Sequence, residues 1–512
     1  MVIQKKNGVF MTLVFIVLGG FAIGSANAAD QPQWGQKHTR NMISGETNLV
    51  SDFDPATQKN VKWAASLGSE TWSTPIVANG KVFIGTNNNA PRDPRHKGDR
   101  GILMCFNEKD GAFLWQLVVP KLGPDPYLDW PRAGIPSPAT VEGDRVYIIS
   151  NRNEVICLDI NGQSNGNDGP YQDEARHMEW SEETAYAFTS VDADIIWIFD
   201  IPGQAGTYPH DSAHSSILLD EDFLYINTSN GVDNTHQKIR KPDAPSLIVL
   251  DKHSGRLLAR DDENIGPRIF HSTWSSPALG VVNGQKLIFF AGGDGVIYAF
   301  AALESTPAVG EVSKLKRIWR FDCDPAAPKE NVHEYLRNRK EGPSNIKGMP
   351  VFHDNRIYVA VGGDIWWGKE QAWLKCIDAT KTEDVTTSAL IWSYELKLHC
   401  CSTPAISDGL VFITDCGGLV HCVDAKTGTA YWTHDTGGEI WASPLVADGK
   451  VYVVNKRRDF FVFAANREKQ VINTIRMDSP MAGAPTAANG VLYVPTMKNL
   501  YALQLDTQNS VH

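Results

Sequence analysis

The sequence predicts an all-β fold, an eight-bladed β-propeller, and three observations lead to it. One repeat runs along the whole chain. Each copy contains short apolar strands of alternating pattern. Turn pairs such as Asp-Gly or Asn-Gly separate these strands, and such pairs supply the positive φ angles that tight hairpins need.

Residues 402–432 form one complete copy of the repeat. It begins with Ser-Thr-Pro and a first strand, continues with Asp-Gly, a second strand, a glycine turn and a third strand, and ends in Asp-Ala-Lys-Thr-Gly-Thr-Ala-Tyr-Trp. The other copies follow the same order, two of them in degraded form. The eight copies begin at Ser73, Ser137, His214, Ser275, Gly348, Ser402, Ser443 and Ala484.

The last three copies are spaced at about forty residues, the period of four-stranded propeller blades. Longer spacings earlier in the chain predict loop insertions near residues 163–195, 232–245 and 325–346. We therefore expect residues 29–512 to form a single propeller domain whose insertions lie at its surface.

A tryptophan ends most copies of the repeat. On an outer strand its ring can lie flat against the glycine turn of the neighbouring blade and join the two blades. The residues expected in this structural docking role are Trp63, Trp115, Trp197, Trp319, Trp392 and Trp432.

The end of the repeat resembles a known family motif. Residues 105–115 and 422–432 are similar to Ala-x-Asp-x-x-Thr-Gly-x-x-x-Trp, the tryptophan-docking motif of the pyrroloquinoline quinone (PQQ) propeller superfamily, with Cys in place of Ala. The resemblance covers roughly residues 32–505 and implies a quinoprotein-like eight-bladed propeller. The PQQ-like repeat family is related to quinoprotein alcohol dehydrogenases and to the propeller lipoprotein of outer-membrane barrel assembly. One such fold hosts many unrelated activities, so the resemblance alone fixes no function.

Residues 1–28 read as a secretory signal peptide. Lys5 and Lys6 precede an apolar run from Val9 to Ile23, and Ala-Asn-Ala at 26–28 matches a cleavage site. A retained membrane anchor is the alternative. We expect a periplasmic or secreted protein with no membrane span after cleavage. The net charge of −11 makes nucleic acid a poor partner.

The eight cysteines fall into groups. Four occupy one column of the repeat, on different blades, and are expected to be small buried hydrophobic residues: Cys105, Cys157, Cys376 and Cys422. Cys323 and Cys416 have no evident partner. Cys400 and Cys401 are adjacent; by the family resemblance they are candidates for a vicinal disulfide beside a cofactor, with two reduced buried thiols as the alternative.

The residues just before each innermost strand should ring the mouth of the central channel. The ring is formed by the residue three positions before each motif proline, or by its equivalent where the proline is missing. These residues are Trp72, Ile135, Ala213, Trp274, Lys347, Cys401, Trp441 and Ala482. The tryptophans could stack a flat aromatic ligand while Lys347 pairs with a carboxylate. PQQ, planar and tricarboxylated, is such a ligand. Alternatively, the tryptophans close the channel to water.

Two residues before four of these ring positions, the sequence has oxygen-bearing side chains of the kind that Ca²⁺ binds: Glu70, Asp211, Asn345 and Glu439. They are the candidate metal ligands, and solvated carboxylates are the alternative. His214, His271 and His399 also approach the mouth, as metal ligands or as satisfied polar residues. The glycine-rich segments 292–295 and 362–367 read as turns between strands.

Two functions follow from these expectations. The first, which the intact repeats and the missing enzyme motifs favour, is a non-catalytic binding or scaffold protein of the cell envelope, with an envelope protein or carbohydrate as partner. The second is a quinoprotein oxidoreductase that uses PQQ and Ca²⁺ on an alcohol, aldehyde or sugar, as the family resemblance implies. No Cys-x-x-Cys-His haem motif is present, so that enzyme would need an external electron acceptor.

Overall fold

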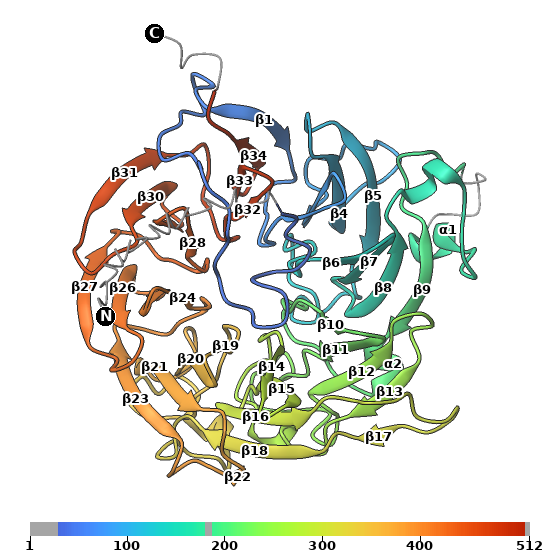
Figure 1. Ribbon diagram of the computed structural model, residues 1–512. Helices are drawn as coiled ribbons and strands as arrows, with labels where there is room; N and C mark the ends of the chain where they lie inside the picture. The colour runs from blue at the N-terminus through green and yellow to red at the C-terminus, as the bar shows by residue number, and fades with distance from the viewer. Residues whose placement is uncertain (1–28, 180–186, 507–512) are drawn as a thin grey trace, which may run out of the picture.

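The protein is an eight-bladed β-propeller, as the sequence predicts. The computed structural model describes residues 29–179 and 187–506, in which eight sheets are arranged around a central channel (Figure 1). The predicted signal peptide lies outside the described residues. Within them, the α-helices are α1 (Glu174–His177) and α2 (Ile201–Ala205), and short 3-10 turns occur at η1 (Gly162–Asn165), η2 (Gly266–Arg268) and η3 (Val332–Tyr335). No helix in this part of the chain is long and apolar enough to cross a membrane.

The first four blades follow the chain in order from the innermost strand outward. Blade 1 consists of β2 (Ile76–Ala78), β3 (Lys81–Asn87), β4 (Arg100–Asn107) and β5 (Phe113–Pro120). Blade 2 consists of β6 (Thr140–Glu142), β7 (Arg145–Ile149), β8 (Glu154–Asp159) and β9 (Ile195–Asp200). Blade 3 consists of β10 (Leu218–Asp220), β11 (Phe223–Asn227), β12 (Leu247–Asp251), β13 (Leu257–Arg260) and β17 (Ser313–Lys314). Blade 4 consists of β14 (Ala278–Val282), β15 (Gln285–Ala291), β16 (Val296–Ala301), β18 (Arg317–Asp322) and β22 (Glu383–Asp384).

The last four blades have four strands each. Blade 5 consists of β19 (Val351–His353), β20 (Arg356–Gly362), β21 (Ala372–Asp378) and β23 (Leu390–Leu396). Blade 6 consists of β24 (Ala405–Ser407), β25 (Leu410–Thr414), β26 (Leu419–Asp424) and β27 (Ala430–Asp435). Blade 7 consists of β28 (Leu445–Ala447), β29 (Lys450–Val454), β30 (Asp459–Ala464) and β31 (Val471–Arg476). Blade 8 consists of β32 (Thr486–Ala488), β33 (Val491–Pro495), β34 (Asn499–Leu503) and β1 (Val61–Ser66).

The two ends of the chain close the ring together. Strand β1 is antiparallel to β34, with Val61 opposite Leu503 and Ser66 opposite Asn499 (Figure 1). The eighth blade therefore takes its outer strand from the start of the propeller and its other three strands from the end. This pairing leaves no open seam between the first and last blades.

Each repeat tryptophan lies between two blades. A Cβ atom added to Gly111 would lie 2.7 Å from the ring of Trp63, so the glycine allows the ring to lie flat on the turn. Each indole N–H donates to a backbone carbonyl of the next blade. The pairs are Trp63 with Glu108, Trp115 with Ile160, Trp197 with Lys252, Trp319 with Ala379, Trp392 with Ala425 and Trp432 with Asn466.

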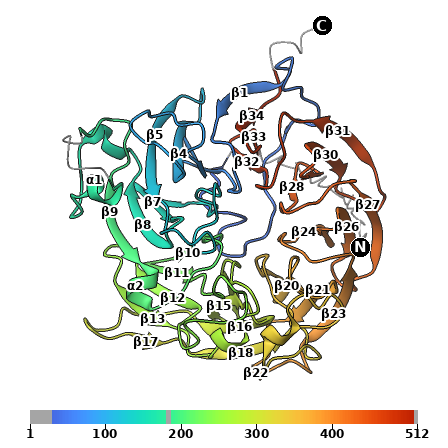
Figure 2. The same ribbon diagram turned by 180° about the vertical axis from the view of Figure 1, so that it is seen from behind.

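The segment before β1 crosses the centre of the ring, where it is the dark blue trace in Figure 2. Its backbone bonds to the free edges of the innermost strands; for example, Gln31 pairs with Val77 of blade 1 and Ser44 bonds to Val446 of blade 7. Arg40, completely buried, donates from Nε to the Pro277 carbonyl oxygen of blade 4 at 2.9 Å. The segment thus bridges blades on opposite sides of the channel and covers edges that would otherwise lack partners.

Candidate functional site

Two stacked cavities occupy the centre of the propeller. The outer cavity, of about 250 Å³, is lined mainly by aromatic side chains, of which Trp130 and Trp366 are partly exposed to solvent. The inner cavity, of about 80 Å³, reaches Trp34 of the N-terminal segment. Three tryptophans and a histidine line both cavities and separate them: Trp72, His214, Trp274 and Trp441. The site is therefore a pocket with an inner end formed by the protein's own N-terminal segment.

The structure brings together most of the ring that the repeat predicts. Of the eight ring positions, six line the inner cavity: Trp72, Trp274, Lys347, Cys401, Trp441 and Ala482. Each lies just before an innermost strand, because each blade is built from the same repeat and enters its first strand from the same end of the channel.

The tryptophans form an aromatic belt (Trp72, Trp274, Trp366 and Trp441). The ring centroids of Trp72 and Trp441 are 5.4 Å apart with a 49° angle between the planes. Trp366 reaches Trp441 at 5.6 Å and Trp274 at 5.9 Å, both edge-on. The belt gives the pocket an apolar wall that favours burial of a ligand.

A buried ion network lies behind this belt. Asp364 Oδ2 is 3.0 Å from His271 Nδ1 and 3.2 Å from Lys347 Nζ, while Asp364 Oδ1 accepts the backbone N–H groups of Trp366 and Trp367. Burial acts to raise the pKa of Asp364, but His271 and Lys347 outweigh it and hold that pKa well below its usual range. The Lys347 ammonium is also 3.9 Å from the centroid of the Trp274 ring.

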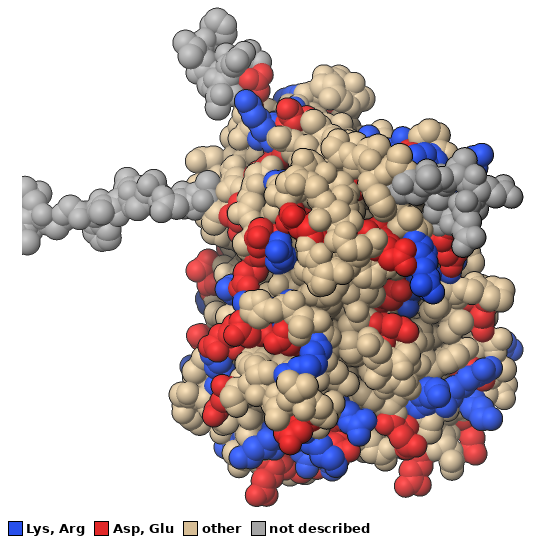
Figure 3. All heavy atoms as spheres, turned by 90° about the vertical axis from the view of Figure 1, so that its right-hand side faces the viewer, with Lys and Arg blue, Asp and Glu red and all other residues tan. Residues whose placement is uncertain are grey.

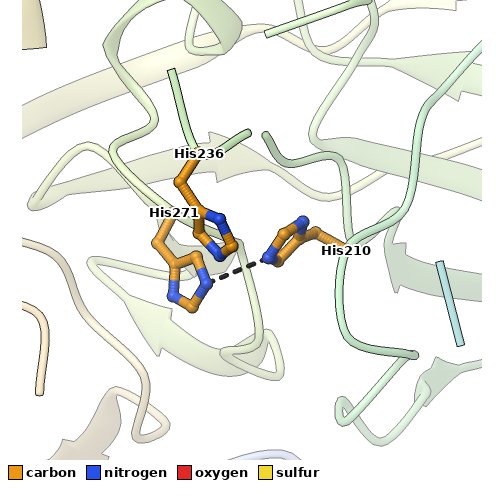
Figure 4. Close-up of side chains that lie close together, drawn as sticks. All are labelled: His210, His236 and His271. Atoms are coloured by element: carbon orange, nitrogen blue, oxygen red, sulfur yellow. Dashed lines mark hydrogen bonds between the residues drawn. The ribbon is translucent and has the colours of Figure 1, made fainter. Parts of the chain in front are cut away.

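A histidine cluster (His210, His236 and His271) lies beside this network (Figure 4). The Nε2 atoms of His210 and His271 are 3.0 Å apart, and the ligand atoms of all three histidines lie within 4.8 Å of one another. Asp211 Oδ2 lies 3.6 Å from His210 Nε2 and 3.5 Å from His271 Nε2. The Asp211 Oδ1 atom is buried without a hydrogen-bond partner among the described residues, and burial raises the pKa of this carboxyl group.

The four predicted metal ligands do not share one point. Glu70 is 3.5 Å from Arg132 Nε, and Glu439 accepts a 2.6 Å hydrogen bond from the indole N–H of Trp441. Asn345 contacts Asp364 at 3.5 Å, whereas Asp211 belongs with the histidines. Glu70, Asn345 and Glu439 line neither cavity. Each of the four thus has a different environment.

The two adjacent cysteines also have different neighbours, and all eight cysteines are unpaired. The Cys400 thiol donates to the Thr414 carbonyl oxygen at 3.0 Å. Cys401 Sγ lies 3.9 Å from Cys416 Sγ. The vicinal ring considered from the sequence is not formed in this structure. The sequence indicates no partner for Cys416, and the structure brings its thiol into contact with Cys401.

PQQ can be tested against these residues. A planar ligand stacks between roughly parallel surfaces, whereas the belt tryptophans meet at tilted or edge-on angles and contact one another. The ligand also carries three carboxylates, yet Lys347 is the only lysine or arginine among the residues that line the two cavities, and it is already paired with Asp364. The residues in this arrangement do not fit PQQ.

The repeat pattern does not reveal several residues of the site. His236 lies in the insertion between β11 and β12, and Asp364 and Trp366 lie in the loop after β20, a segment that reads as a simple glycine turn. His210 precedes the degraded third copy. The register of the repeat does place His271 and Asp211 near the mouth, and this was the available signal for the cluster.

Comparison with known proteins agrees with the fold. A family model described as "Outer membrane protein assembly factor BamB" matches residues 36–164 and 370–473. The two matched ranges lie within the eight-bladed propeller that the structure shows. A quinohemoprotein alcohol dehydrogenase from Pseudomonas putida HK5 superposes on this propeller with a TM-score of 0.58 at 10% identity, covering 93% of this chain and 80% of that one, which shows a shared fold.

Two curated relatives match parts of the propeller. A protein named tetrathionate hydrolase from Acidithiobacillus ferrooxidans is 23% identical over 301 residues, which is 55% of each chain. A polyvinylalcohol dehydrogenase from Sphingopyxis is 27% identical over 128 residues, 23% of this chain and 20% of the relative. The chain thus spans about half of the first relative and a fifth of the second.

Proposed function

We propose that this propeller is an exported hydrolase that acts on a compact substrate in the outer cavity. The observation that carries the proposal is the Asp211 carboxylate, which lines an aromatic pocket, is held beside two histidines, and keeps one oxygen without a hydrogen-bond partner among the described residues. Buried acids with perturbed pKa values are typical of catalytic sites. A scaffold that only docks partners has no need for such a group.

Asp211 is suited to be the general base. Burial raises the pKa of the Asp211 carboxyl group. A base whose pKa lies closer to neutral pH is a stronger proton acceptor. In this mechanism the Asp211 carboxylate takes a proton from a water molecule, and the oxygen of that water forms a bond to a sulfur atom of the substrate. The sulfur–sulfur bond at that atom breaks, and the leaving sulfur departs with the electron pair. The carboxylate lies beside the Nε2 atoms of His210 and His271, and Asp364 fixes the ring of His271 through the contact at Nδ1.

The aromatic belt would bind the substrate. The outer cavity of about 250 Å³ suits a small molecule better than a polymer chain. Lys347 lines the inner cavity and is paired with Asp364, so the outer cavity binds its ligand mainly through the belt. The name of the relative that matches 301 residues makes tetrathionate the first substrate to test.

The surface is consistent with a site at the channel rather than on the side of the ring. On the side seen in Figure 3, acidic and basic side chains are interspersed, with no extended region of one charge to attract a charged macromolecule. Export is part of the proposal because residues 1–28 have the pattern of a signal peptide.

The test is incubation of the purified protein with tetrathionate, with loss of tetrathionate and release of acid as readouts. Asp211→Asn should lower the rate by roughly 10²–10⁴-fold, the usual contribution of a general base, without weakening substrate binding measured by quenching of tryptophan fluorescence. Glu70→Gln is the matched control, a mouth carboxylate that lines neither cavity.

Two outcomes would overturn the proposal. Neither binding nor turnover of tetrathionate would return the protein to the scaffold class with an envelope protein or carbohydrate as partner. Saturable quenching by PQQ with Ca²⁺, followed by oxidation of an alcohol, aldehyde or sugar, would assign it to the quinoprotein dehydrogenases.

A further inference from the structure

The contact between His210 and His271 requires something between the two rings. His210 Nδ1 lies 2.8 Å from the carbonyl oxygen of Val232, which can only accept a hydrogen bond, so Nδ1 carries the proton. His271 Nδ1 faces the Asp364 carboxylate at 3.0 Å and donates in the same way. In neutral rings both Nε2 atoms then present lone pairs, and these atoms are 3.0 Å apart. Either a proton or a cation must lie between them.

The spacing fits a metal ion. Two histidine nitrogens at about 2.0–2.1 Å from Zn²⁺ lie about 2.9 Å apart at a right angle and about 3.4 Å apart at a tetrahedral angle. The 3.0 Å separation of the two Nε2 atoms falls in this range. His236 brings a third ring nitrogen within 4.8 Å of both, and the three rings point toward one region (Figure 4).

The surroundings of the cluster are those of a metal centre. Histidines that bind metal usually donate their other N–H to a carboxylate or a backbone carbonyl, which fixes the tautomer. His271 does this with Asp364 and His210 with the Val232 carbonyl oxygen. With the protons at Nδ1, the Nε2 atoms of His210 and His271 carry the lone pairs that a metal ion takes.

We infer that His210, His236 and His271 bind a divalent transition-metal ion of the Zn²⁺ class at the base of the outer cavity. Three imidazoles suit Zn²⁺ or Cu²⁺ and not the Ca²⁺ expected from the mouth carboxylates. Since His236 and His271 line the cavity, the remaining coordination position opens to a water molecule and the substrate. This inference deepens and rests on the proposed function, because metal binding lowers the pKa of that water and Asp211 accepts its proton.

The first experiment measures metal, not activity. The purified full chain is stripped with a chelator and titrated with Zn²⁺ by calorimetry and with Co²⁺ by visible absorption, and metal content is measured by mass spectrometry. We expect one equivalent per chain and a Co²⁺ spectrum of low coordination number. His236→Gln should abolish stoichiometric binding. His236 is 5% exposed but belongs to the insertion between β11 and β12 and not to a blade strand, so this variant should still fold, which calorimetry checks.

Two further variants make the assignment specific. Asp364→Asn should weaken Zn²⁺ binding by roughly 10–100-fold, as the loss of a ligand-orienting group does. His214→Gln is the matched control: His214 is a partly buried histidine of the same cavity outside the cluster, and the variant should bind one equivalent of metal.

The outcomes separate this inference from the proposed function. No stoichiometric binding of Zn²⁺, Co²⁺ or Cu²⁺, or unchanged binding in His236→Gln, would overturn the metal site and leave a shared proton between His210 and His271. Tetrathionate turnover by metal-free protein would overturn the role of the metal in the reaction and leave the hydrolase standing. Stoichiometric binding without turnover of tetrathionate would keep the metal site and remove the hydrolase.

Discussion

Removal of the docking tryptophan Trp432 tests how the blades are held together. This side chain is 7% exposed, its ring centroid is 5.6 Å from that of Phe463 in the next blade, and its indole N–H donates to the Asn466 carbonyl oxygen at 3.0 Å. Burial of about 230 Å² at about 25 cal/mol per Å² gives about 6 kcal/mol, an upper bound because the unfolded chain already hides part of this surface. Buried Trp→Ala changes cost about 3–5 kcal/mol, so we expect about 4 kcal/mol for Trp432→Ala.

The assay is differential scanning calorimetry of the full chain. An unfolding entropy of about 2.1 cal/mol/K per residue over roughly 480 residues is about 1 kcal/mol/K, so the variant should melt about 4 °C below wild type. Thr433→Ala, which changes an exposed residue on the same strand, should stay within about 0.5 kcal/mol of wild type. A Trp432→Ala protein that melts no lower than this control would refute the docking role.

Two other predictions concern buried titratable groups. Mild oxidation should form a disulfide between Cys401 and Cys416. Their sulfur atoms are 3.9 Å apart, and the hydrogen bond between them lowers the pKa of the Cys401 thiol. Peptide mass mapping checks this, and a disulfide between Cys400 and Cys401 would contradict it. Burial raises the pKa of Asp261 to about 6, above its value in the unfolded chain, so the stability it contributes is complete below about pH 4 and is lost as the pH rises through about 6. In urea unfolding, the free energy of unfolding of Asp261→Asn minus that of wild type should therefore increase from about pH 4 to above about pH 6. A difference that does not change with pH would show that Asp261 does not titrate in this way.

Features that repeat with each blade could be predicted from the sequence. Trp432 and the other docking tryptophans share one column, and a column in a repeat becomes one place in every blade. The same reasoning predicted that Trp72, Trp274 and Trp441 would converge, since each precedes an innermost strand and these strands all face the channel. The sequence thereby determined the number of blades, the contacts between them and the aromatic wall of the site.

The repeat placed His271 and Asp211 near the mouth, but the partners of these residues were decided by the tertiary structure. His236 and Asp364 come from loops that follow no period, and nothing in their local sequence indicates that they meet His271. Conversely, Glu70 and Glu439 share a column with Asp211, yet their side chains turn to Arg132 and to Trp441. A repeat fixes where a backbone position lies, whereas the direction of a side chain and the path of an inserted loop depend on packing against blades distant in sequence.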